Sequence, residues 1–259
     1  LIFFHIDKLF FRGKISLTSV IAMVVCSLLI ITLKAYVLLA FIPALLLGTY
    51  FYYITNVKGF TRYVLALVLL VGFVFGGAFL LQYFATMSQD FALDRLAEVA
   101  ESFQSSHGRL AETGQAGSGY SLHISNYTMA GMVAVLPQAV NVSLFRPYLW
   151  EANSPVMLIS ALESMAFAIF TLKVIWKKGV FKFLRLMLEP FALMGIVYSV
   201  ILGFAIGITA FNFGALVRFK IPLVPFLLIS LLIIQNKDNN NLATDKDKDE
   251  QPKELPSSA

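Results

Sequence analysis

The stretch that decides the fold is ISLTSVIAMVVCSLLIITLKAYVLLAFIPALLLGTYFYYI, residues 15–54. It consists of two apolar runs, 15–33 and 35–54, which are separated only by Lys34. A helix needs about 20 mostly apolar residues to cross a bilayer core that is about 30 Å thick. Each run has that length, so the stretch predicts two transmembrane helices that meet at Lys34.

Four more apolar segments follow along the chain. The runs 64–84, 155–176 and 191–210 predict three further spans. The last run, 221–234, would be only about 21 Å long as a helix, which is too short to cross unaided. A sixth span over 216–234 must therefore begin near Leu216, or this segment is broken or enters only half of the membrane. The sequence thus predicts an all-α polytopic transmembrane bundle of about six spans, forming a single domain over residues 1–234.

The composition agrees with a membrane protein. Of the 259 residues, 58% are apolar and 14% are charged, whereas a soluble domain has about 45–50% apolar and about 25% charged residues. The 16 glycines, nine prolines and single cysteine exclude collagen-like and disulfide-stapled scaffolds. The three histidines lack the spacing of metal ligands, and Cys26 is the only cysteine. The sequence therefore predicts neither a metal site nor a cofactor. The basic residues form no cluster typical of a nucleic-acid surface.

The basic residues predict the orientation of the bundle. Most lysines and arginines flank the same ends of successive spans, and cytoplasmic loops carry this excess. Both termini are therefore expected in the cytoplasm, and the long loop 85–153 outside. The tail 235–259 is polar with charges of both signs, so it cannot bury enough surface to fold and is predicted to be disordered.

The long outer loop contains two distinct segments. Residues 88–106 have an apolar stripe at helical spacing and predict an amphipathic helix that packs on the protein. The later segment 129–145 is apolar but is interrupted by Pro137 and Gln138. It predicts a re-entrant or a surface-lying segment, and the sequence does not separate these two possibilities.

Small residues predict where helices pack closely. Gly195, Ser199, Gly203 and Gly207 lie four apart on one stripe, and Gly72 and Gly76 have the same spacing, with Gly77 beside them. Transmembrane helices associate through such faces because small side chains let the backbones approach. The partner can be another span of this chain or a second membrane protein.

One ionisable residue lies inside a predicted span. Glu163 is about 12 Å from the outer end of the 155–176 helix, close to the membrane midplane. An intramembrane charge is a functional candidate by default, so Glu163 is a possible proton or cation relay. The structural alternative is a hydrogen-bonded glutamate that joins two helices.

Three cations and a carboxylate mark the candidate binding site on the outer face. Arg146 and Glu151 precede the fourth span, and Arg218 and Lys220 lie at the membrane boundary where the irregular sixth span is short. A guanidinium suits bidentate capture of phosphate, so an anionic lipid headgroup or a lipid-linked diphosphate is a reasonable ligand. The structural alternatives are an Arg146–Glu151 ion pair and cations that simply anchor the helices at the membrane surface.

Two segments carry a resemblance to known proteins. LFRPYLWEANSPVMLISALE, residues 144–163, resembles a stretch that recurs in bacterial polytopic membrane proteins of surface-polysaccharide assembly. FGALVRFKIPLVPFL, residues 213–227, is similar to the late arginine–proline segment of membrane glycosyltransferases and O-antigen polymerases that use polyprenyl-linked sugars. The resemblance implies a multi-pass protein of the bacterial inner membrane in which Arg146, Arg218 and Lys220 meet a polyprenyl diphosphate.

The sequence departs from these families at one point. Membrane glycosyltransferases of the large-loop type carry an acidic residue in the first outer loop, which here is essentially Lys34. O-antigen polymerases and ligases instead use arginines and a histidine, roles that Arg146 with His107 or His123 would fill.

The leading hypothesis is therefore a glycosyl polymerase or transferase-like protein of lipid-linked polysaccharide assembly, with no catalytic residue assigned. The alternatives are a transporter or flippase that uses Glu163, and a non-catalytic subunit of a membrane complex.

Overall fold

A computed structural model describes residues 16–56, 59, 61, 64, 67–68, 71–72, 101–102, 105–106, 109, 119–122, 124 and 128–249. This part of the chain is helical, with one isolated antiparallel bridge between Gly119 and Asn212 and no strand, which confirms the predicted all-α class for it. Three of the helices are long and apolar enough to cross a membrane, or four if one bent pair counts as a span. The predicted span 64–84 and loop helix 88–106 lie largely outside the described residues.

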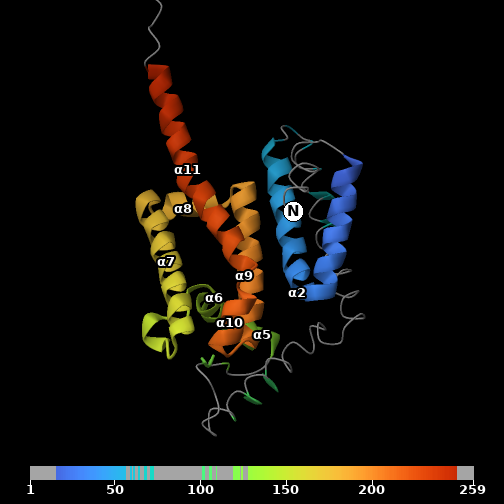
Figure 1. Cartoon of the computed structure of the whole chain (residues 1–259). Coiled ribbons are helices and arrows are strands. Elements are labelled where there is room, and N and C mark those ends of the chain that lie inside the picture. Colours follow the sequence, from blue (N-terminus) through green and yellow to red (C-terminus); the bar gives the residue numbers. More distant parts are fainter. Residues whose placement is uncertain are drawn as a thin grey trace, which may run out of the picture.

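The helix α2 (Leu17–Asn56) consists of two helices that are joined at Lys34. Lys34 has non-helical backbone angles (φ −154°, ψ 74°), and the two halves run in opposite directions (Figure 1). The second half, Tyr36–Thr55, has the length and hydropathy of a span, whereas the first half, Leu17–Thr32, is apolar but shorter. Residues 15–54 therefore form two helices as expected, and the second of them has the length and hydropathy of a span.

The helices α7 (Pro155–Lys178) and α9 (Pro190–Thr209) match the predicted fourth and fifth spans. Both begin with proline, which suits the first turn because no donor is needed there. Ser154 also caps α7, since its side chain accepts a hydrogen bond from a first-turn N–H. Gly179 ends α7 in the left-handed region (φ 73°), which glycine adopts without strain, and the chain turns into α8 (Val180–Met187).

The last apolar segment is a bent pair of helices, which has the geometry of a broken span or of a re-entrant loop. The helix α10 (Phe213–Phe219) and the membrane-length part of α11 (Leu223–Asp249) are bent by 60° relative to each other. Pro222 lies at the break and Pro225 follows it, and prolines at such positions lack the N–H that would continue the helix. The prediction of an irregular sixth segment, made from its short length, is confirmed.

The C-terminal end of α11 differs from the expectation. The sequence predicts a disordered tail from residue 235, whereas the helix continues to Asp249 and projects beyond the bundle (Figure 1). Neither glycine nor proline occurs between Phe226 and Gln251. Because no helix-breaking residue interrupts this stretch, a helix that starts in the apolar part extends into the polar part.

Two short helices precede α7. The helices α5 (Met129–Ala134) and α6 (Leu136–Phe145) meet at Val135, and Pro137 lies in the first turn of α6. α6 packs against α9 and buries Ala139 and Val142. The segment 129–145 is thus part of the helical core rather than a detached surface element.

The bundle is built around α9. The membrane-length window of α9 is 67% buried, against 28% for both α7 and the second half of α2. α9 contacts α2, α6 and α11, so its neighbours come from both the N-terminal and the C-terminal parts of the chain.

The predicted small-residue face of α9 is where these contacts are closest. A Cβ atom added to Gly207 would lie 2.3 Å from the backbone oxygen of Ala139 in α6. One added to Gly195 would lie 2.7 Å from the backbone oxygen of Phe226 in α11. The partners of this face, which the sequence leaves open, are therefore helices of the same chain.

The second predicted glycine face is only partly described. A Cβ atom on Gly72 would meet no atom of the described residues within 4 Å, and Gly76 and Gly77 lie outside the described residues. Contact of this face with another membrane protein stays a prediction. Gly48 in α2, which the sequence analysis did not single out, makes a close approach instead, because its Cβ would lie 2.9 Å from Met194 Cβ.

Basic residues gather at both ends of the bundle. The last turn of α7 carries Lys177 and Lys178, and close to it Lys237 of α11 forms an ion pair with Glu189 at the start of α9. The opposite end, at α10, carries the predicted site residues, and Lys34 lies over the ring of Phe219 there. Which side of a membrane each end faces stays a prediction.

Candidate functional site

The predicted binding residues lie at the α10 end of the bundle. There α6, the 3-10 helix η3 (Leu149–Glu151), the start of α7 and α10 come together (Figure 1). Arg146 directly follows α6, and Glu151 ends η3. Arg218 lies in α10, and Lys220 caps its C-terminal end.

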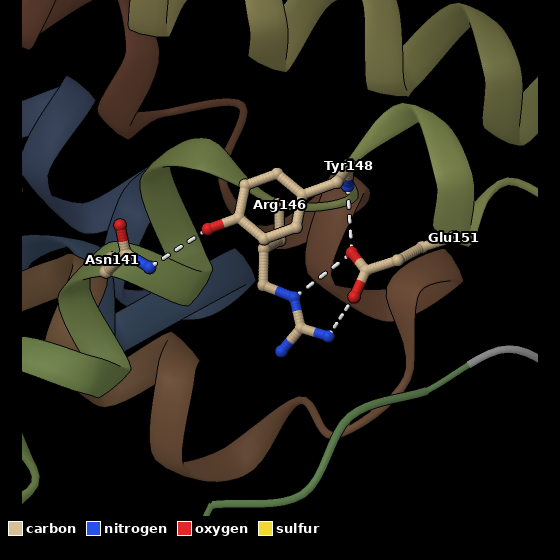
Figure 2. A network of polar contacts seen from close by, with 4 residues as sticks. All are labelled: Asn141, Arg146, Tyr148 and Glu151. Carbon is tan, nitrogen blue, oxygen red and sulfur yellow. Dashed lines mark hydrogen bonds and ion pairs between the residues drawn. The ribbon is translucent and has the colours of Figure 1, made fainter.

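Arg146 and Glu151 form a bidentate ion pair. The Arg146 Nε donates to Glu151 Oε2 at 3.1 Å, and Nη2 contacts Oε1 (Figure 2). The backbone N–H of Tyr148 donates to the same Oε2 at 2.8 Å. The Arg146–Pro147 peptide bond is cis. The structure thus contains the ion pair that the sequence analysis kept as the structural alternative.

Three aromatic rings surround the guanidinium of Arg146. Its Cζ lies 5.4 Å from the ring centroid of Tyr120, 5.7 Å from that of Tyr148 and 5.1 Å from that of Phe213. A cation within about 6 Å of an aromatic centroid is attracted to the ring. These three residues come from separate parts of the sequence, so Arg146 joins the 119–122 segment, the turn after α6, and α10.

The aromatic residues are themselves fixed by hydrogen bonds. The Tyr120 Oη donates to the backbone oxygen of Gly207 at 2.9 Å, which connects the site to α9. The side chain of Asn141 in α6 donates to Tyr148 Oη at 3.2 Å (Figure 2). The position of Arg146 therefore depends on α6, α9 and α10 together.

The ion pair is mostly shielded from water. The side chains of Arg146 and Glu151 are 19% and 16% exposed. Burial disfavours the charged carboxylate, but the hydrogen bonds from Arg146 and from the Tyr148 N–H outweigh it and lower the pKa of Glu151 below its ordinary value. The pair therefore contributes its full stability above that ordinary value, and loses it as the pH falls through the lowered pKa.

Lys220 points inward. It is 3% exposed, and its Nζ donates to the Oγ of Ser164 in α7 at 2.6 Å. The one hydroxyl hydrogen of Ser164 is shared between two acceptors, the backbone oxygen of Ser160 at 2.9 Å and that of Arg146 at 3.2 Å. Lys220 thus connects the break between α10 and α11 to α7 and, through Ser164, to the backbone of Arg146.

The other polar candidates are exposed. Arg218 projects from α10, and its Nε donates to the backbone oxygen of Gly214 at 3.0 Å. Glu163 is exposed on α7, next to Ser164, and its charge acts on Lys220. Lys34 is exposed as well, with its Nζ 5.6 Å from the centroid of the Phe219 ring.

These surroundings divide the predicted binding residues into two groups. Arg146, Glu151 and Lys220 make contacts within the protein, whereas Arg218 presents its guanidinium to the surroundings of α10. Sequence reasoning missed Ser164 and Tyr120. The spacing of Ser160 and Ser164 on one face of α7 was a signal for the first, whereas no local pattern identifies Tyr120 as a partner of Arg146.

A serine substitution tests the buried contact of Lys220. We expect Ser164→Val to lower the free energy of unfolding by about 2–3 kcal/mol, because a buried ammonium then loses its acceptor. The double variant Ser164→Val/Lys220→Met should recover most of this loss, since no buried charge remains. Unfolding by SDS titration in mixed micelles measures both. Equal losses in the single and the double variant would show that Ser164 does not stabilise Lys220.

The structure also bears on metal ligands and on the histidines considered as partners of Arg146. Among the described residues, no group of three or more histidine, cysteine, aspartate or glutamate side chains is arranged to hold a metal ion. His107 and His123, the histidines considered as partners of Arg146, lie outside the described residues.

Comparison with known proteins leaves the site to be interpreted from its own geometry. No family model matches the sequence, and the searches of curated proteins and of solved structures found no match.

Proposed function

We propose that the protein is a multi-pass protein of the bacterial inner membrane that acts in the assembly of a lipid-linked cell-surface polysaccharide. In this proposal it is a glycosyl polymerase or transferase-like protein, and it binds the polyprenyl diphosphate of its substrate at the α10 end of the bundle. Arg218 makes the direct contact, while Arg146, Glu151 and Lys220 hold the elements around it in place.

The break between α10 and α11 is the observation that supports this proposal most. Irregular backbone within a membrane is tolerated where it is buried in protein or lines a water-filled space. Here the break between α10 and α11 follows an exposed arginine by only a few residues, and Arg218 uses one nitrogen within its own helix. The two terminal nitrogens of the guanidinium have the geometry to bind two oxygens of a phosphate group.

The contacts of Arg146 support the same location. They fix the turn after α6 against α10 through Phe213, which begins the helix that carries Arg218. A site for a charged substrate needs such fixed neighbours, because a misplaced contact loses most of its effect. The residues that resemble the polysaccharide-assembly proteins thus meet in space, although they are far apart in the sequence.

An arginine substitution tests the function. In a bacterium whose own copy of the gene is replaced, we expect Arg218→Ala to reduce surface polysaccharide at least about tenfold, the effect of losing one charge-assisted contact of 1.5–3 kcal/mol. The amount of membrane-inserted protein should stay normal because Arg218 is exposed. Lys173→Ala, which removes an exposed cation from α7, is the matched control. Normal polysaccharide in the Arg218→Ala strain would contradict the proposal.

The same assay separates the transporter alternative. Glu163 is exposed on α7, so Glu163→Gln removes its charge with little change in the size of the side chain. Loss of polysaccharide in Glu163→Gln but not in Arg218→Ala would favour a coupling role for Glu163. The alternative of a non-catalytic subunit rests on glycine faces that are free to bind a partner. The glycine face of α9 is instead covered by α6 and α11 of the same chain.

A further inference from the structure

An apolar cavity lies between the α2 hairpin, α9 and the start of α11. Its volume is about 460 Å³, and its lining includes Cys26 and Leu29 from the first half of α2, Val37 from the second half, Tyr198 from α9, and Pro222 and Pro225. Ligand sites commonly have volumes of about 300–1,000 Å³. None of the residues assigned above to the polysaccharide site lines it, so it is a separate feature of the fold.

The cavity follows from two features of the backbone. The bend of 60° between α10 and α11 and the prolines near it keep this part of the chain from packing as a straight helix against α2. The cavity is partly open to its surroundings, and its lining is almost entirely apolar, so it does not hold ordered water. A hydrocarbon chain is therefore the occupant that the lining favours.

One end of the cavity is close to a cation. Lys34 lies three residues before the lining residue Val37, and its exposed ammonium sits over Phe219, three residues before Pro222. Tyr36, beside it, has a buried hydroxyl with no hydrogen-bond partner among the described residues. The rings of Tyr36 and Phe219 lie edge to face with their centroids 6.3 Å apart, so Tyr36 and the Lys34 ammonium share Phe219 as a neighbour.

We propose that the cavity holds the hydrocarbon chain of a membrane lipid whose phosphate is bound by Lys34. The apolar lining selects the chain, and the ammonium selects a negatively charged headgroup. This inference rests on the proposed function for the nature of the lipid, a polyprenyl phosphate. A glycerophospholipid with an anionic headgroup has the same chemistry, and the experiment below distinguishes the two.

Cys26 provides a direct probe because it lines the cavity and is the only cysteine of the chain. We expect a polyprenyl phosphate to slow the alkylation of Cys26 by a small maleimide at least about fivefold in the purified full chain, measured by intact mass. Phosphatidylglycerol, phosphatidylcholine and inorganic diphosphate are the comparison ligands. In Lys34→Gln the slowing should largely disappear, whereas in Lys173→Gln, with the same change of charge on α7, it should remain.

Two further variants keep the result interpretable. In Val25→Cys/Cys26→Ser the thiol moves to a neighbouring residue that is 49% exposed and outside the described lining, so added lipid should not slow its alkylation. In Leu29→Trp a larger side chain enters the cavity from an exposed position, so alkylation of Cys26 should be slow before any lipid is added. Melting temperatures of all variants show whether each is folded.

The outcomes separate this inference from the proposed function. If neither phosphate lipid slows alkylation, the cavity proposal is wrong, even if Arg218→Ala still abolishes polysaccharide. Equal slowing by the zwitterionic phosphatidylcholine also overturns it, because the site then does not select a negatively charged headgroup. Slowing that survives in Lys34→Gln overturns it too, because Lys34 then does not hold the phosphate. Slowing by phosphatidylglycerol but not by the polyprenyl phosphate supports a phosphate-lipid site here and contradicts the lipid assumed in the proposed function.

Discussion

Replacing Gly207 by alanine is expected to separate α6 from α9 and to destabilise the protein by more than about 3 kcal/mol. The added Cβ would lie 2.3 Å from the backbone oxygen of Ala139 and 2.7 Å from its carbonyl carbon. Because both atoms belong to the backbone, no rotation of a side chain relieves the contact, and the whole of α6 must move. Such a movement also displaces Arg146, which follows α6 directly.

At a second glycine on the same face, the destabilisation can be reversed by a second substitution. The Cβ of Gly203→Ala would lie 2.7 Å from Ser143 Oγ but 3.8 Å from Ser143 Cβ. We therefore expect Gly203→Ala to be destabilising and Gly203→Ala/Ser143→Ala to recover most of the loss. No substitution at Ala139 should rescue Gly207→Ala in the same way. Gly72→Ala, where the Cβ meets no atom of the described part of the chain within 4 Å, is the control that should be neutral.

Unfolding by SDS titration and the monodispersity of the purified protein measure these effects. Full stability of Gly207→Ala would mean that α6 does not lie on α9 as described. Failure of Ser143→Ala to rescue Gly203→Ala would mean that the contact at this level involves a different neighbour.

Removal of Arg146 is expected to have the second largest effect, a loss of about 2–4 kcal/mol in the free energy of unfolding. Arg146→Ala removes the ion pair and three aromatic contacts, and it leaves the carboxylate of Glu151, which is 16% exposed, without its cation. Arg146→Lys should lose a large part of this energy too, because an ammonium cannot form the bidentate pair.

A double variant identifies the cause of this loss. In Arg146→Met/Glu151→Leu no partly buried charge is left unpaired, so the protein should be more stable than Arg146→Ala. The level of folded protein in membranes and the amount of polysaccharide are measured on the same strains. If Arg146→Ala remains fully stable but makes no polysaccharide, Arg146 acts on the substrate rather than on the fold.

The spans could be predicted from the sequence because their signals are local. Apolar runs of sufficient length predicted α7 and α9, and prolines with a short run predicted the broken segment at Pro222. Lys34 was correctly expected to separate two helices. The end of α11 was predicted less well, since polarity indicates solvent exposure, whereas a helix continues until a residue interrupts it.

The site was harder to predict because its contacts are not local. Arg146 and Glu151 are close together in the sequence, and their ion pair was predicted as the structural alternative to a phosphate site. The rings of Tyr120 and Phe213 come from distant segments, and only the packing of α6 and α10 on either side brings them to Arg146. The inward direction of Lys220 likewise depends on the angle of the break, which composition does not determine.

The packing of α6 on α9 also constrains how the chain is made. α6 ends at Phe145, and α9 is complete only at Thr209, so the ribosome needs about 3–13 s to supply the partner at 5–20 residues per second. During that interval the face that will cover Gly203 and Gly207 has no helix to receive it. Newly made α6 therefore lacks its packing partner until α9 has been synthesised and inserted.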